Sequence, residues 1–136
     1  MRFAELKDRI FSVPSGDRRW YSIIFWWELR RPVYNLIVGL GGVVGLAIFA
    51  IINELPPERP FSERDWEPMA VFVFAIAANV FYTGGWATEI LARAIWKEKA
   101  ENFGPIALGL GIIFSVLLAF LPATVEGIVW VVRGLR

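Results

Sequence analysis

The sequence predicts an all-α integral membrane protein with three transmembrane helices, preceded by one or two short amphipathic helices at the membrane interface. Three observations predict this class: hydrophobic residues make up 57% of the chain, three long stretches carry no charged residue, and small residues recur at every fourth position of the last stretch. The hydrophobic share exceeds the roughly 45–50% that is usual in soluble domains. The lipid bilayer is therefore the expected surroundings of most of the chain.

Residues 1–31 form an expected cytoplasmic segment at the membrane interface. Apolar residues recur there at helical spacing among charged ones, namely Phe3, Leu6, Ile10 and Val13. Pro14, Ser15 and Gly16 interrupt this pattern, and Asp17 can cap a second helix. Amphipathic helices of this kind lie on a membrane surface. The alternative is that the same mixture of basic and aromatic residues docks a cytoplasmic partner.

Three charge-free stretches define the expected spans. They comprise residues 32–53, 68–88 and 102–125. A helix needs about 20 apolar residues to cross a hydrocarbon core of ~30 Å, so each stretch is long enough to cross once. We expect spans at about residues 33–53, 69–88 and 104–123, within a transmembrane domain that covers residues 32–136. Buried helices of a soluble protein are not expected, because none of the three stretches has a polar face to meet water.

The second helix is expected to continue beyond its span as a charged, solvated turn or two. Glu89, Arg93 and Lys97 recur there at four-residue spacing. Pairs at this spacing contribute only about a few tenths of a kcal/mol in water. They indicate an exposed helical face and not a binding site.

Small residues mark helix-packing faces in the first and third spans. No hydrophobic force draws helices together in lipid, so their association depends on close backbone contact, which small side chains permit. The third span carries a ladder of such residues: Ala107, Gly111, Ser115, Ala119 and Ala123. The first span carries Gly39, Gly41, Gly42 and Gly45. We expect this glycine face to be the ladder's partner within the chain, and further faces to contact other copies or other membrane subunits.

Polar residues within the apolar stretches are candidates for function. Asn79 and Thr83 share one stripe of the second span, and an amide at mid-depth is costly without a partner. An interhelical hydrogen bond is the expected partner, and the alternative is that the stripe lines a pore or a ligand cavity. Glu126 lies at the outer headgroups if the third span ends near Pro122. It lies inside the bilayer if the helix continues to Val132, with Pro122 then kinking the helix.

The composition lacks the usual parts of an enzyme. The chain has no cysteine and no histidine, which excludes disulfides, thiolate or imidazole metal sites and the commonest general base. Ser115 therefore has no histidine to activate it. The glycine run around Gly41 lacks the βαβ context of a dinucleotide site. A net charge of +1 gives no reason to expect nucleic acid as a partner. We expect no enzymatic activity, no catalytic residue, no cofactor and no bound metal.

The functional expectation is a non-catalytic accessory or scaffolding subunit that packs through its small-residue helix faces. Its partners would be the lipid bilayer and either further copies of the chain or other membrane subunits. The alternative is a homo-oligomeric pore, channel or membrane-perturbing protein in which the stripe of Asn79 and Thr83 faces water. The two differ in the direction in which Asn79 points.

The distribution of basic residues predicts the orientation, because segments rich in lysine and arginine resist translocation. The N-terminal segment and the second loop together hold ten basic residues, whereas the first loop and the C-terminal tail hold four. We therefore expect a multi-pass protein of the cell membrane, inner or plasma, with its N-terminus cytoplasmic and its C-terminus outside.

Single-cysteine labelling tests this orientation, since the chain has no native thiol. In intact cells, a membrane-impermeant maleimide should label Ser62→Cys, and Glu98→Cys should react only after the membrane is permeabilised. The reverse pattern would contradict the predicted orientation.

Overall fold

The computed structural model describes residues 5, 8, 10–13, 19–56 and 68–135. Every regular element in these residues is helical, and the elements are α2 (Trp20–Glu28), α3 (Arg31–Glu54), α4 (Pro68–Trp96), the short 3₁₀ helix η2 (Lys97–Ala100), α5 (Phe103–Ala119) and α6 (Leu121–Gly134). The expected all-helical class is confirmed for this part of the chain. Part of the first expected amphipathic helix, including Phe3 and Leu6, lies outside the described residues.

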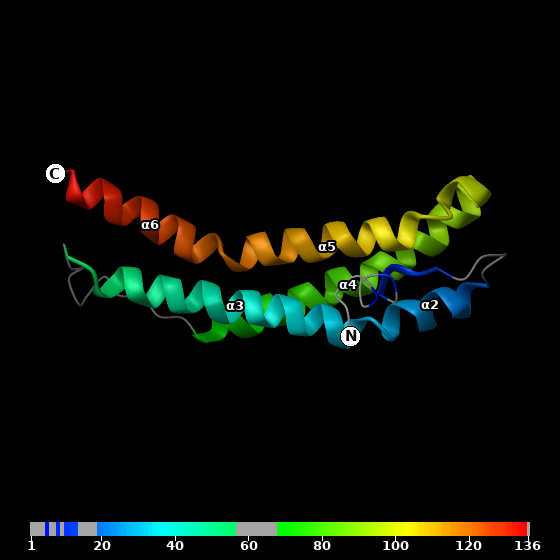
Figure 1. Ribbon diagram of the computed structural model, residues 1–136, viewed down its shortest axis with the longest axis horizontal. Helices are drawn as coiled ribbons and strands as arrows, with labels where there is room; N and C mark the ends of the chain where they lie inside the picture. The colour runs from blue at the N-terminus through cyan, green and yellow to red at the C-terminus, as the bar shows by residue number, and fades with distance from the viewer. Residues whose placement is uncertain (1–4, 6–7, 9, 14–18, 57–67, 136) are drawn as a thin grey trace.

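Three helical segments are long and apolar enough to cross a membrane: Trp20–Glu54, Met69–Trp96 and Phe103–Gly134. They are longer than the expected spans because α2 leads into α3, α4 continues past residue 88, and α6 follows α5 with a single intervening residue. Figure 1 shows that α3 and the α5–α6 pair run in the same direction, whereas α4 runs in the opposite direction. This is the arrangement that three successive crossings require.

Proline residues explain why the first and third segments are each divided in two. Pro32 lies at the start of α3 and Pro122 at the start of α6. Proline has no N–H to donate and clashes with the preceding turn, so it favours the first turn of a new helix over the middle of an old one. The break before Pro122 falls at Phe120, and Figure 1 shows the axis bending there.

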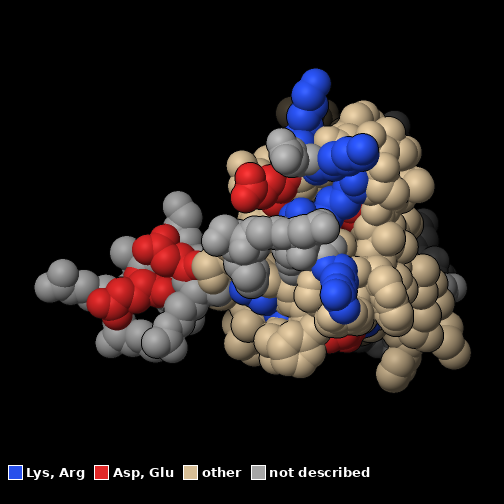
Figure 2. Space-filling view, turned by 90° about the vertical axis from the view of Figure 1, so that its right-hand side faces the viewer, with Lys and Arg blue, Asp and Glu red and all other residues tan. Residues whose placement is uncertain are grey.

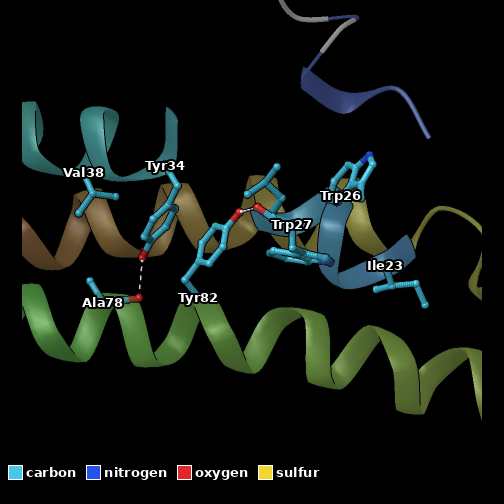
Figure 3. Packing of buried hydrophobic residues seen from close by; sticks show 8 residues of the cluster. Ile23, Trp26, Trp27, Tyr34, Val38, Ala78 and Tyr82 are labelled. Carbon is cyan, nitrogen blue, oxygen red and sulfur yellow. Dashed lines mark hydrogen bonds between the residues drawn. The ribbon is translucent and has the colours of Figure 1, made fainter. Parts of the chain in front are cut away.

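The helix α2 lies where the second amphipathic helix is expected from the sequence, and it packs against α4. Its Ile23, Trp26 and Trp27 are buried in the largest core cluster of the described residues. Figure 3 shows Trp27 of α2 beside Tyr82 of α4, whereas Trp26 points away from α4. The helix is therefore part of the bundle. Its position on the membrane surface stays a prediction.

The third segment holds the bundle together. It packs through α5 against both α3 and α4, and through α6 against α3. The core cluster joins α2, α3, α4 and α5, and it consists of Ile23, Trp26, Trp27, Tyr34, Val38, Ala78, Tyr82 and Leu108. The best-packed part of the described structure therefore lies at the end where α3 begins.

The glycine face of α3 contains positions in very different surroundings. A Cβ on Gly45 would lie 2.7 Å from the carbonyl oxygen of Ala119, whereas one on Gly41 would make ordinary contact with Val116 at 3.4 Å. A Cβ on Gly39 or Gly42 would meet nothing within 4 Å. Backbone-to-backbone approach between α3 and the third segment thus depends on Gly45.

Replacing Gly45 by alanine should destabilise the fold by about 1–3 kcal/mol, because the added methyl group pushes α3 away from Ala119. Gly39→Ala is the matched control, and it should be neutral or up to ~1 kcal/mol stabilising, since alanine favours helix and the space is open. The free energy of unfolding can be measured by denaturant titration in detergent micelles, followed by circular dichroism. Equal effects of the two substitutions would contradict the close approach.

Candidate functional site

Arg31, the first residue of α3, is the centre of a polar cluster formed with Glu28, Asn79 and Thr83, which we call the Arg31 cluster. Its Nε and Nη2 atoms donate to the Glu28 carboxylate at 2.8 and 2.7 Å. Its Nη1 donates to Asn79 Oδ1 at 3.3 Å, and Nη2 also donates to Thr83 Oγ1 at 3.0 Å. The bidentate pair with Glu28 balances the guanidinium charge, so the cluster is polar but carries no net charge.

Asn79 and Thr83 therefore have partners within the chain. Beyond the bonds to Arg31, Asn79 Nδ2 donates to the carbonyl oxygen of Ala75 at 3.1 Å, and Thr83 Oγ1 donates to the carbonyl oxygen of Asn79 at 2.9 Å. The sequence reasoning placed these two residues on one stripe but did not identify Arg31 as their partner. The sequence did show an Arg-Arg pair before Pro32. The long side chain of an arginine can reach one turn or more along a neighbouring helix.

A second cluster surrounds Glu89 of α4, which is completely buried; we call it the Glu89 cluster. Glu89 Oε2 accepts a hydrogen bond from the indole Nε1 of Trp27 at 2.7 Å, and Oε1 accepts one from Arg93 Nε at 2.9 Å. Arg93 Nη2 also donates to the carbonyl oxygen of Glu101 at 2.9 Å. The cluster thus connects α2, α4 and the turn before α5.

Gly104 shows how closely α5 begins beside this carboxylate. A Cβ at Gly104 would lie 2.5 Å from Glu89 Oε2, so no larger residue fits there without moving the side chain. Gly104 belongs to the first turn of α5, and the positive end of a helix dipole favours a nearby carboxylate. The start of α5 therefore both covers Glu89 and stabilises its charge.

The expectation of a solvated charged face on this part of α4 is wrong for Glu89. Trp27 and the start of α5 cover it, and helical spacing alone cannot reveal elements that pack from elsewhere in the chain. Arg93 is partly buried by the same cluster, whereas Lys97 is exposed. Lys97 has a φ of 47°, which is uncommon for a residue with a side chain, and it marks the point where α4 ends.

Tyrosine hydroxyls complete the polar contacts of the core. Tyr82 donates to the backbone oxygen of Trp27. Tyr34 donates to the backbone oxygen of Ala78 at 3.2 Å and shares a hydrogen bond of 2.7 Å with the Ser115 hydroxyl. Figure 3 shows these rings in a row, with centroids 4.6 Å apart for Tyr34 and Tyr82 and 5.2 Å apart for Tyr82 and Trp27. Ser115 thus packs against a tyrosine and is not paired with a base.

One indole in the core differs from the others. Among the described residues, Trp86 carries the one buried side-chain donor, its Nε1, for which no hydrogen-bond partner is found.

Glu126 is the buried carboxylate of α6, with 3% of its surface exposed. It accepts a hydrogen bond from Arg133 of the same helix. Trp130 Nε1 donates to the backbone oxygen of Pro56 at 3.1 Å, which ties α6 to the end of the first segment. The helix continues past Val132, and its axis bends before Pro122, as in the second of the two alternatives above. The depth of Glu126 in a bilayer stays a prediction.

The ladder residues of the third segment are divided between the inside and the outside of the bundle. Ser115 and Ala123 are buried, and Ala107 and Ala119 are partly buried. Gly111 has no atom within 4 Å of where its Cβ would lie. The ladder therefore supplies contacts within the chain and leaves one open position on α5.

The polar groups of these clusters form contacts between and within helices. Each of the two buried glutamates of the described residues accepts a hydrogen bond from an arginine of its own helix, as in an ion pair. In the part of the chain that the structure describes, no group of three or more acidic, cysteine or histidine side chains could hold a metal ion.

Replacing Glu89 by glutamine should destabilise the fold by about 1–3 kcal/mol, because a neutral amide of the same shape cannot accept from both Trp27 and Arg93. Glu101→Gln is the matched control, since that residue is exposed, and it should change the free energy of unfolding by less than ~0.5 kcal/mol. Denaturant titration in micelles measures both. If the two variants are equally stable, the Glu89 cluster does not hold the bundle together.

Comparison with models of protein families, with curated proteins and with solved structures finds no match to this chain. The function of the chain is therefore inferred from its own contacts.

Proposed function

We propose that this chain is a non-catalytic accessory or scaffolding subunit of the cell membrane, which joins other helices through its small-residue faces. One observation carries the proposal: Asn79 and Thr83 are bonded within the chain, while Gly111 of the ladder, which is partly buried, has no atom within 4 Å of where its Cβ would lie and lines a pocket of about 300 Å³ between α4 and α5. The chain thus uses the Asn79 and Thr83 side chains in its own fold and keeps an open position on α5 for a partner.

The Arg31 cluster favours this role over the alternative of a pore or channel. A water-filled pore needs polar side chains that face the water. The Asn79 amide and the Thr83 hydroxyl instead bond to Arg31 and to the backbone of their own helix. The side chains of this stripe, which would have to face water in a pore, are thus used in contacts within one chain.

The surface around Gly111 suits a second helix. Leu110 and Phe114 flank it with 62% and 60% of their surfaces exposed, and bulky side chains beside a glycine form the ridge and groove into which another helix packs. No more than 22% of the most apolar 18-residue stretch of any candidate span is buried inside the chain. Ample apolar surface therefore remains for lipid and for partner helices.

The charges support the proposed orientation, with the N-terminus cytoplasmic and the C-terminus outside. Figure 2 shows lysine and arginine side chains gathered over one end of the molecule. This is the end where α2 begins and α4 finishes in η2 (Figure 1), and the basic residues of the last turn of α4 and of η2 are Arg93, Lys97 and Lys99. Positive segments stay on the cytoplasmic side, so this end is proposed to be cytoplasmic.

Replacing Gly111 by isoleucine should dissociate the assembly, because a branched side chain holds the facing backbone away. Gly84→Ile is the matched control on α4, where a Cβ likewise meets nothing within 4 Å, and it should leave the assembly intact. The measurement is the mass of the complex after gentle extraction from the native membrane, compared with the 15.4 kDa of one chain.

Two outcomes would contradict the proposal. One is a single-chain mass for the unmodified protein, because a subunit needs a partner. The other is an ion conductance in reconstituted vesicles that Asn79→Leu abolishes, since that result would place the stripe in a pore. A mass that includes other polypeptides, or a multiple of the chain mass, supports assembly and distinguishes foreign partners from self-association.

A further inference from the structure

An apolar groove of about 580 Å³ lies between α3 and α4. Small residues line both walls, including Gly39 and Gly42 on α3 and Ala75 on α4, and the third segment contributes Leu118 and Ala119. A Cβ on Gly39 or Gly42 would meet no atom of the described residues within 4 Å, so the space beside them is open in that part of the chain. The groove is distinct from the face around Gly111, which does not line it.

The dimensions of the groove suit an extended hydrocarbon chain as its occupant. Its α3 wall extends from Asn35 to Phe49, which is ~21 Å at ~1.5 Å per residue. The volume of 580 Å³ then corresponds to a mean cross-section of roughly 28 Å² along that length. An extended hydrocarbon chain can therefore lie along the groove.

The two ends of the groove differ in polarity. Asn35 and Asn79 line one end, near the start of α3, and the other lining residues are apolar apart from their backbone. Asn35 is exposed, and within the described residues its amide makes no hydrogen bond. A long apolar groove with the unbonded amide of Asn35 at one end matches a molecule with a hydrocarbon tail and oxygen acceptors at its head.

The charge at this end argues against selection for an anionic head. Arg31 lies next to Asn79, but Glu28 pairs with its guanidinium through two hydrogen bonds. The end of the groove is therefore polar without net charge. Ester and phosphate oxygens, which all phospholipids carry, are the acceptors that such amide donors suit.

We infer that this groove binds one acyl chain of a membrane phospholipid, with the ester and headgroup oxygens at the end formed by Asn35 and Asn79. The lipid belongs to the leaflet on the side where α3 begins. It fills the space that the small residues leave between α3 and α4, and so acts as a structural ligand of the bundle.

Native mass spectrometry of the full chain, released from nanodiscs of palmitoyl-oleoyl phosphatidylcholine, tests this inference. The unmodified protein should retain one phospholipid. Gly42→Leu should weaken lipid retention by about tenfold or more, because the leucine side chain occupies the empty space. Gly84→Leu is the matched control, since Gly84 is equally open but lies outside the groove, and it should retain the lipid.

A second substitution tests the opposite wall of the groove. Ala75→Leu on α4 should also reduce lipid retention, and circular dichroism verifies that each variant remains helical. Equal retention by the unmodified protein, Gly42→Leu and Ala75→Leu would overturn the inference. So would an unmodified protein that is a dimer without lipid and that Gly42→Leu converts to a single chain, because a second copy would then occupy the groove. Neither result bears on the assembly through Gly111, which has its own test.

Discussion

The structure depends on one constraint: a charged group buried among apolar helices has to find its partners within the protein, because hydrocarbon offers none. Glu89 meets this constraint most completely, with Trp27 and Arg93 bonded to its two oxygens and Gly104 leaving room for it. These contacts bring α2, α4 and the start of α5 together at one point. The core cluster, the tyrosine contacts and the Arg31 cluster all lie along the helices that meet there.

Features that depend on short stretches of sequence could be predicted, and features that depend on distant partners could not. The apolar segments follow from length and the absence of charge, and they are found where expected, although they extend further at their ends. The partners of Glu89 and Asn79 are 62 and 48 residues away in sequence. Helical spacing describes one helix at a time, so it indicated a solvated face for Glu89, which another helix and the start of α5 cover in the folded chain.

The small residues show a similar limit. A recurring glycine pattern says that close approach is permitted, but it does not say where the approach occurs. In α3 the pattern extends over four glycines, yet only Gly45 has the backbone of another helix against it, while Gly39 and Gly42 face an open groove. The glycines differ because they lie on different faces of α3: Gly41 and Gly45 face the third segment, whereas Gly39 and Gly42 face the groove between α3 and α4. Which neighbour each face meets is a property of the assembled bundle and leaves no local mark in the sequence.

The bond between Trp27 and Glu89 has a consequence for biosynthesis. The ribosome makes the chain from its N-terminus, so Trp27 is complete 62 residues before Glu89 exists. During that interval α2 and α3 lack α4 and α5, against which they pack, and the Trp27 indole has no carboxylate to accept its hydrogen bond. Docking of α2 must wait until α4 and the start of α5 have been inserted. The helix α2, though made early, is therefore among the last parts of the bundle to reach its final position.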